Sequence, residues 1–215
     1  MGIAKNGLMG GVSGRVGNIV GVNRNGSFYF RSLPVDKKNP KTEKQVRQRS
    51  KFLVTQSFLR TFSPFLRVGF RFEAMGMKST FNAAMSVNMP HVIKDENNGF
   101  VVDYPNVLVS KGLLGTSEIT AATVAEGVFC VNWNDVSGDN ASYNDEVMML
   151  AYNPEKNVAV YDLHAGKREH LEARLALPMN WEGDSVETYI AFMSADVKQV
   201  SDSLYAGRHL VVSIR

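Results

Sequence analysis

Basic side chains gather in the N-terminal third of this 215-residue chain, and their chemistry points to a charged partner. Residues 1–78 contain fifteen Lys and Arg against three acidic residues, a local net charge of +12. Residues 79–215 contain nine against eighteen, a local net charge of −9. A basic segment of this kind can neutralise nucleic-acid phosphates or dock on an acidic protein surface, including the body of a second copy. The candidate contact residues, which include two aromatic residues able to stack on bases, are Arg15, Arg24, Phe28, Tyr29, Arg31, Lys37, Lys38, Lys41, Lys44, Arg47, Arg49 and Lys51.

The sequence contains no recognisable catalytic or metal-binding pattern. Its four histidines follow no metal-ligand spacing, and the single cysteine, Cys130, cannot form a Cys-x-x-Cys site. Cys130 alternates with Phe129 and Val131 in a β-prone run, so we expect it to be buried as a small apolar residue. The glycine-rich stretch 10–15 lacks the Gly-Lys-Ser/Thr ending of a phosphate-binding loop. We therefore expect no catalytic residue, cofactor or metal, and a protein that is not an enzyme.

One acidic loop is nevertheless rich in oxygen ligands. Segment 134–146 contains Asp135, Asp139 and Asp145, which are the kind of ligand that calcium takes, although the EF-hand pattern is not met. A solvated hairpin loop is the alternative interpretation. A second predicted turn, at residues 165–168, is expected to have exposed side chains.

The first part of the chain, residues 1–38, is predicted to be a basic arm that contains a β-hairpin. Eight of the eighteen glycines lie in residues 1–26. Asn25 and Gly26 separate two β-prone runs, which indicates a hairpin because type I′ turns need positive φ at both central residues. A lone hairpin is marginally stable in water, so this one needs another surface to cover it.

Residues 39–97 are predicted to be a helical connector. Thr42 and Gln45 form a capping box, and the first helix should end near Phe62, before a Ser-Pro pair. Lys44, Arg47 and Lys51 share one face of this helix, and phenylalanines after it indicate a small helical core. The predicted apolar face comprises Val46, Leu53, Val54, Ser57 and Phe58.

From residue 98 to residue 215 the pattern changes to short β-prone runs separated by Gly, Asn, Asp and Pro. Seven to nine strands without intervening helices are typical of an antiparallel immunoglobulin- or fibronectin-like β-sandwich, with Trp133 as a core residue. The fold class is therefore mainly β with a helical segment. The predicted strands are 100–104, 107–110, 119–124, 128–133, 146–152, 158–163, 170–177, 186–193 and 209–214.

The environment of the protein is predicted from what the sequence lacks. No apolar run approaches the ~18 residues of a membrane-spanning helix, so no membrane insertion is expected. The first residues have no apolar core of a signal peptide, and one cysteine forms no internal disulfide. We expect synthesis in a reducing cytoplasm without a signal peptide.

Several segments resemble an uncharacterised Bacteroidota family. Residues 13–21 read S-G-R-V-G-N-I-V-G, close to that family's S-G-K-V-G-N-V-V-G, and the segments R-S-L-P at 31–34 and N-P-K-T at 39–42 follow it. Glu43 and Lys44 stand where that family commonly has Pro-Ala. The second half is similar at the Trp133 strand and at residues 152–154, 177–178 and 194–196. The resemblance implies association with phages or prophages, but it implies no activity and no functional residues.

Charge and resemblance together predict a structural assembly protein, a subunit of a virion whose arm docks on copies of itself or on other structural subunits. The first alternative is a sequence-independent nucleic-acid-binding protein that uses the same basic arm. The second is an adhesin-like or carbohydrate-binding sandwich, in which Trp181 and Tyr205, both predicted in loops, would face the sugar.

Overall fold

The structure is a computed structural model, and it describes residues 3–4, 11–24, 26–33, 41–74, 78–91, 93–96, 99–134 and 140–212. The chain divides into two compact units, Met1–Val46 and Arg47–Arg215. Boundaries after residues 38 and 97 remain predictions; the second compact unit contains helices as well as the sandwich strands. No helix in the described part of the chain is long and apolar enough to cross a membrane.

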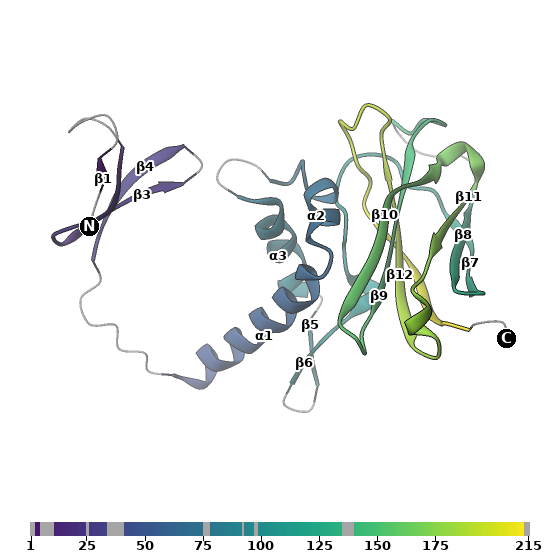
Figure 1. Ribbon diagram of the computed structural model, residues 1–215, viewed down its shortest axis with the longest axis horizontal. Coiled ribbons are helices and arrows are strands. Elements are labelled where there is room, and N and C mark those ends of the chain that lie inside the picture. The colour runs from purple at the N-terminus through teal and green to yellow at the C-terminus, as the bar shows by residue number, and fades with distance from the viewer. Residues whose placement is uncertain are drawn as a thin grey trace. The chain divides into compact units, whose positions relative to one another are not determined.

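The first unit contains a four-stranded antiparallel sheet, here called the arm sheet, with the strand order β1-β2-β3-β4 (Figure 1). β3 pairs with β4 from Ile19 opposite Ser32 to Arg24 opposite Ser27, so the two strands form a hairpin around the predicted Asn-Gly turn. Asn25 itself lies outside the described residues. The strands are β1 (Ile3–Ala4), β2 (Val12–Val16), β3 (Ile19–Arg24) and β4 (Ser27–Ser32).

Three helices follow: α1 (Glu43–Arg60), α2 (Ser63–Gly69) and α3 (Thr80–His91). α1 begins where the capping residues predict, and the backbone N–H of Gln45 donates to the Thr42 hydroxyl at 3.4 Å. Pro64, which lacks an N–H, lies in the first turn of α2 and separates it from α1. The helical core predicted from the phenylalanines is confirmed, because Phe58, Phe62, Phe65 and Phe70 are buried.

The second unit also contains the β-sandwich, whose two sheets face each other (Figure 1). Lettered A to G in chain order, strands β7 to β13 form the sheets A-B-E and D-C-F-G, the strand order of a fibronectin-like sandwich. Trp133 is buried between the sheets, as the sequence predicts. The strands are β7 (Ile119–Ala125), β8 (Val128–Trp133), β9 (Glu146–Asn153), β10 (Val158–Lys167), β11 (Glu172–Ala176), β12 (Ser185–Met193) and β13 (Leu204–Leu210).

Shorter elements complete the second unit. The hairpin β5 (Ile93–Glu96) and β6 (Gly99–Val102) lies between the helices and the sandwich in the chain. Three single 3₁₀ turns, η1 (Tyr104–Asn106), η2 (Arg168–His170) and η3 (Met179–Trp181), connect the strands.

The central strands β9 and β12 are covered on both faces. One set of their side chains, including Met149 and Ile190, packs against the three-stranded sheet. The alternate set, including Leu150 and Tyr189, packs against the helices with Phe62. The helices, the β10-β9-β12-β13 sheet and the β11-β8-β7 sheet therefore form three layers (Figure 1). The β10-β9-β12-β13 sheet is the middle layer, with the helices on one face and the other sheet on the opposite face.

Two predicted strands are wrong. Residues 107–110 form no strand; their backbone is held instead by side chains, since the Ser203 hydroxyl accepts from the Val109 N–H at 2.9 Å. The last strand ends at Leu210 and begins five residues before the predicted start. The predicted apolar face of α1 is also wrong in part, because Leu53 is 61% exposed and the buried side chains of α1 are Thr55, Phe58 and Leu59.

Candidate assembly or nucleic-acid interface

Strand register gives the arm sheet two chemically different faces. Residues that pair directly across strands project to the same face, and neighbours along a strand project to opposite faces. The pairs Val16–Ile19 and Gly21–Phe30 place one set of side chains together. We call this set the apolar face: Val16, Ile19, Phe28 and Phe30. The pairs Arg15–Val20 and Val20–Arg31 define the opposite set, the basic face: Arg15, Arg24, Tyr29 and Arg31.

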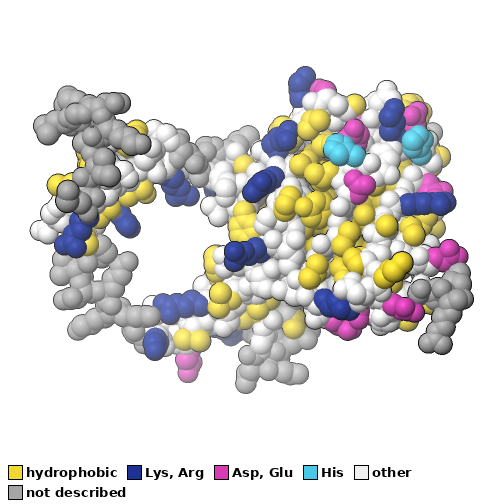
Figure 2. Space-filling view, in the orientation of Figure 1, with side chains coloured by type: hydrophobic (Ala, Val, Ile, Leu, Met, Phe, Trp, Pro, Cys, Tyr) yellow, Lys and Arg dark blue, Asp and Glu magenta, His cyan; other side chains and the backbone are white. Residues whose placement is uncertain are grey.

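All four side chains of the apolar face are exposed. The exposed fractions are 56% for Val16, 49% for Ile19, 53% for Phe28 and 64% for Phe30. With about 200 Å² for a phenylalanine side chain and about 150 Å² for valine or isoleucine, the four expose roughly 400 Å². Apolar surface of that order matches the largest patch on a typical monomer, and such patches are often functional. Figure 2 shows hydrophobic side chains at the surface of this segment beside Lys and Arg.

Close backbone packing explains why glycines are needed in the arm sheet. A Cβ on the buried Gly21 would lie 2.2 Å from the Val12 carbonyl oxygen. A Cβ on Gly11 would lie 2.0 Å from the Phe28 ring. The chain around the start of β2 therefore packs tightly against β3 and β4, and a side chain at either position would push the strands apart.

The basic face combines separated positive charges with one aromatic ring. Arg15 and Arg31 flank Val20 in one row across β2, β3 and β4, and Tyr29 follows on the same side of β4. The Arg15 Nε donates to the Gly17 carbonyl at 3.1 Å, which leaves its terminal N–H groups for other acceptors. Tyr29 is 43% exposed. Residues 11–33 contain three arginines and no acidic residue, so charge in this segment is of one sign.

The structure separates the twelve predicted contact residues into several groups. Phe28 lies on the apolar face, opposite Tyr29, so the two rings cannot stack in one site. Lys41, Lys44 and Arg49 are exposed at or near the start of α1. Lys37 and Lys38 lie outside the described residues. Of the other α1 residues, Lys51 is half-buried and the exposed Arg47 places its guanidinium 5.7 Å from the ring centre of Phe100.

Sequence reasoning missed Val16, Ile19 and Phe30 as candidate contact residues. The signal was present as a two-residue alternation, because Phe28 and Phe30 alternate with Tyr29 and Arg31 in β4. The strand pairs identify which residues of β2 and β3 share each face, and pairing is not visible in one strand alone.

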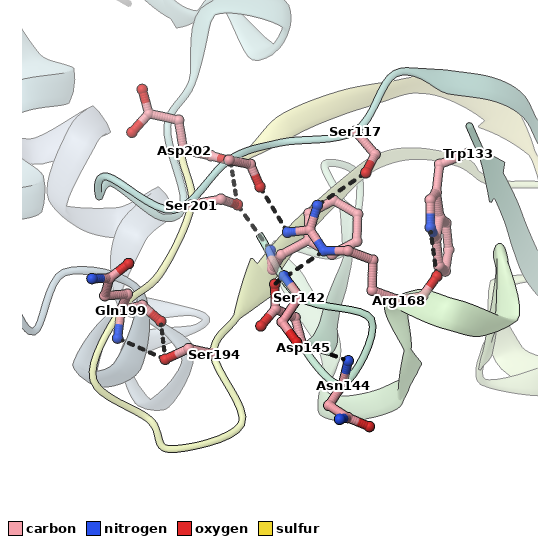
Figure 3. A network of polar contacts seen from close by, with 12 residues as sticks. Ser117, Trp133, Ser142, Asn144, Asp145, Arg168, Ser194, Gln199, Ser201 and Asp202 are labelled. Carbon is pink, nitrogen blue, oxygen red and sulfur yellow. Dashed lines mark hydrogen bonds and ion pairs between the residues drawn. The ribbon is translucent and has the colours of Figure 1, made fainter. Parts of the chain in front are cut away.

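One carboxylate of the acidic loop proposed for calcium, that of Asp145, lies in the protein interior (Figure 3). Asp145 is 1% exposed, and Oδ2 lies 3.2 Å from Nε of Arg168, which is fully buried. That contact is ionic, since the Nε–H does not point along a hydrogen bond. The Ser142 N–H donates to the same carboxylate at 2.8 Å. Asp145 is therefore used by the fold, while Asp135 and Asp139 lie outside the described residues.

Arg168 itself was predicted in an exposed turn, and that prediction is wrong. Its terminal nitrogens donate to the Ser117 hydroxyl at 3.0 Å and to the Gly115 carbonyl at 2.7 Å. Its guanidinium lies 3.8 Å from the ring centre of Phe192, and the Trp133 indole donates to its carbonyl. Burial lowers the pKa of the Arg168 guanidinium, and the neighbouring carboxylate opposes that change. Figure 3 shows these contacts converging from loops and strands that are distant in sequence.

Two other predictions of burial and exposure are corrected. Cys130 is half-buried rather than buried, because the alternation in β8 projects it away from the core side chains Phe129 and Val131. Its thiol donates to Glu172 Oε1 at 3.4 Å. Burial is the larger cause, and this hydrogen bond a smaller one, of a raised pKa of the thiol. Trp181 is 2% exposed and packs in the sandwich core, so it cannot face a sugar.

Tyr205 is likewise part of the fold rather than of a loop surface. It lies on β13, half-buried, and its hydroxyl donates to the buried Glu187 carboxylate at 2.5 Å. The two residues proposed for carbohydrate contact thus serve the interior of the second unit.

A groove of about 440 Å³ runs beside α1 in the second unit. Its lining includes Ser57, Tyr104 and Tyr152, and the other lining residues are apolar. No group of three or more His, Cys, Asp or Glu that could hold a metal occurs among the described residues. The arm sheet therefore remains the surface with the clearest interaction chemistry.

Comparison with known proteins points to a protein family of unknown function. Searches of curated proteins and of solved structures found no match. One family model, described as a family of unknown function, matches residues 11–207, which include nearly all of the arm sheet, the helices and the sandwich. The chain belongs to this family, DUF6266.

Proposed function

We propose that this protein is a structural subunit without catalytic activity, and that the apolar face of its arm sheet packs against another copy of the chain. The observation that carries the proposal is the exposure of four apolar side chains on one face of that sheet. Burying their roughly 400 Å² would contribute on the order of 10 kcal/mol before the costs of association. That gain is enough to favour a defined contact once the rest of an interface is added.

Charge complementarity favours a second copy as the occupant, because basic residues outside the basic face, such as the exposed Lys41 and Lys44, can meet the acidic residues of segment 79–215. Residues 1–78 carry a net charge of +12 and residues 79–215 carry −9, so each copy offers both partners of an electrostatic contact. Opposite fields of this size steer association and suppress like-with-like contacts. Contacts between unlike surfaces of identical subunits close into rings or extend as filaments, both of which are forms of assembly.

The assembly that we propose is a phage particle, with this chain as a capsid- or tail-associated subunit. The resemblance of residues 13–21, 31–34 and 39–42 to a phage-associated family supports this assignment.

Sedimentation velocity on three matched chains tests the proposal. The wild-type chain is expected to form oligomers of defined size at tens of micromolar and moderate salt. The Phe28→Thr/Phe30→Thr chain removes two exposed rings while keeping β propensity, and is expected to sediment as a monomer. Tyr29→Thr is the control, because it makes the same change on the opposite face of the same strand and should leave the oligomer intact.

Either of two results would refute the proposal. A wild-type chain that remains monomeric at 100 μM has no self-assembly for the apolar face to mediate. An oligomer that persists in Phe28→Thr/Phe30→Thr is built by some other surface.

A further inference from the structure

We infer that the basic face of the arm sheet binds single-stranded nucleic acid through its phosphates, with the Tyr29 ring stacked on a base. This inference goes beyond self-assembly and uses the opposite side of the same sheet. The residues that carry it are Arg15, Tyr29 and Arg31.

The geometry of the face suits an extended strand of nucleic acid. Neighbouring strands of a sheet lie about 4.8 Å apart, so Arg15 and Arg31, with β3 between them, are separated by roughly 10 Å. Tyr29 lies about 7 Å from Arg31 along β4. An exposed ring beside arginines is the combination that binds single strands without sequence preference, because every base offers a π face.

The small side chains around these residues leave the face open. Val20 and Val22 lie between the charged residues and are half-buried, so they form a low floor beneath the longer side chains. Arginine suits this position because its guanidinium presents several N–H donors in a plane that matches phosphate oxygens. The Nε contact of Arg15 with the Gly17 carbonyl also orients that guanidinium.

Nucleic acid fits this face better than the acidic body of a neighbouring copy does. A protein carboxylate surface would be served by the arginines alone and would not need an exposed ring between them. The tyrosine adds a stacking surface, and the absence of acidic residues from 11–33 removes repulsion of a continuous phosphate chain. The acidic body is therefore the competing occupant that the experiment must distinguish.

Salt dependence supplies the quantitative test. Neutralising two phosphates of a single strand, one each by Arg15 and Arg31, predicts a slope of about −1.4 for the logarithm of the binding constant against that of salt. Between 50 and 200 mM salt the affinity should fall roughly 7-fold. The assay is fluorescence anisotropy with a labelled oligothymidylate of about 20 nucleotides, on the full chain after removal of copurifying nucleic acid.

Four variants separate the basic face from the apolar one. Arg15→Gln/Arg31→Gln should bring the slope close to zero, whereas Arg15→Lys/Arg31→Lys should retain it, which shows that charge rather than folding of the arm is responsible. Tyr29→Thr should weaken binding at least fivefold with an unchanged slope. Phe28→Thr/Phe30→Thr should keep the salt dependence of the wild-type chain. If this variant is a monomer, its affinity is that of a single chain for the oligonucleotide.

Three outcomes would overturn the inference. One is no binding of the oligonucleotide at 50 mM salt and 100 μM protein. A second is binding whose slope is the same in wild type and in Arg15→Gln/Arg31→Gln. The third is a loss of self-association in that variant without any oligonucleotide binding in wild type, which would assign the face to the acidic body of a second copy. Because the two sets of residues lie on opposite faces, failure here leaves the assembly test unaffected.

Discussion

Replacing Arg168 with methionine is expected to destabilise the sandwich by about 3–5 kcal/mol, the usual cost of removing one partner of a buried ion pair. Methionine matches much of the length of the arginine side chain, so the lost contacts rather than an empty cavity dominate the effect. The carboxylate of Asp145, 1% exposed, would keep its hydrogen bond from the Ser142 N–H and lose the cation beside it.

Smaller terms add to this cost. Arg168 donates to the buried Ser117 hydroxyl, which costs about 1–3 kcal/mol when left unpaired, and to the half-buried Gly115 carbonyl, which costs less because water can reach it. The contact of the guanidinium with Phe192 is lost as well. Local relaxation of the structure offsets part of these added costs. We therefore expect the cost of one broken ion pair and not the sum of all the lost contacts.

Equilibrium urea unfolding followed by tryptophan fluorescence measures the effect. Trp133 and Trp181 are the two tryptophans of the chain, and both are buried in the sandwich core, so the signal reports on this body directly. The informative control is the double variant Arg168→Met/Asp145→Asn, which also removes the stranded charge. It should be more stable than Arg168→Met by at least 1 kcal/mol, because an uncharged amide costs less to bury than an unpaired carboxylate.

The reasoning fails if Arg168→Met lies within 1 kcal/mol of wild type with an unchanged m-value. It fails equally if Asp145→Asn further destabilises Arg168→Met, because then the carboxylate was not the group left without compensation.

Further predictions concern the helical layer, one close backbone contact and the buried tyrosines. Phe58→Ala should cost about 3–5 kcal/mol by urea unfolding, because its ring packs edge-to-face at the helix–sheet core; a cost below 1 kcal/mol would contradict that packing. Gly112→Ala should lower stability by about 1–3 kcal/mol in the same assay, since a Cβ would lie 2.0 Å from the Val200 carbonyl oxygen, and a neutral result would disprove that approach. Burial raises the pKa of Tyr152 and of Tyr189, so the stability they contribute is complete below pH 10 and is lost as pH rises through their folded-state pKa values. Absorbance titration at alkaline pH should show these phenols ionising together with unfolding, and ionisation near pH 10 in the folded protein would count against their burial.

Local sequence determined those features that depend on short-range chemistry. Thr42 and Gln45 predict where α1 begins, because a helix start needs partners for its free N–H groups. The alternation from Val128 to Trp133 predicts a strand with Trp133 facing inward. Most strands of the sandwich were predictable for the same reason, and the fold class followed from their number and spacing.

Tertiary structure decided the features that depend on which elements meet. The apolar run Val147–Tyr152 is consistent with a strand, but only packing shows that the helices cover one of its faces and the second sheet the other. Arg168 looks like a turn residue in sequence, and its burial depends on Asp145 and Ser117, which other segments bring to it. The two faces of the arm sheet likewise depend on strand register, because a shift of one residue would exchange the apolar and basic sets. Composition determined that the N-terminal segment is basic, while pairing between strands determined where its charges and its rings lie, because pairing joins residues that are distant in sequence.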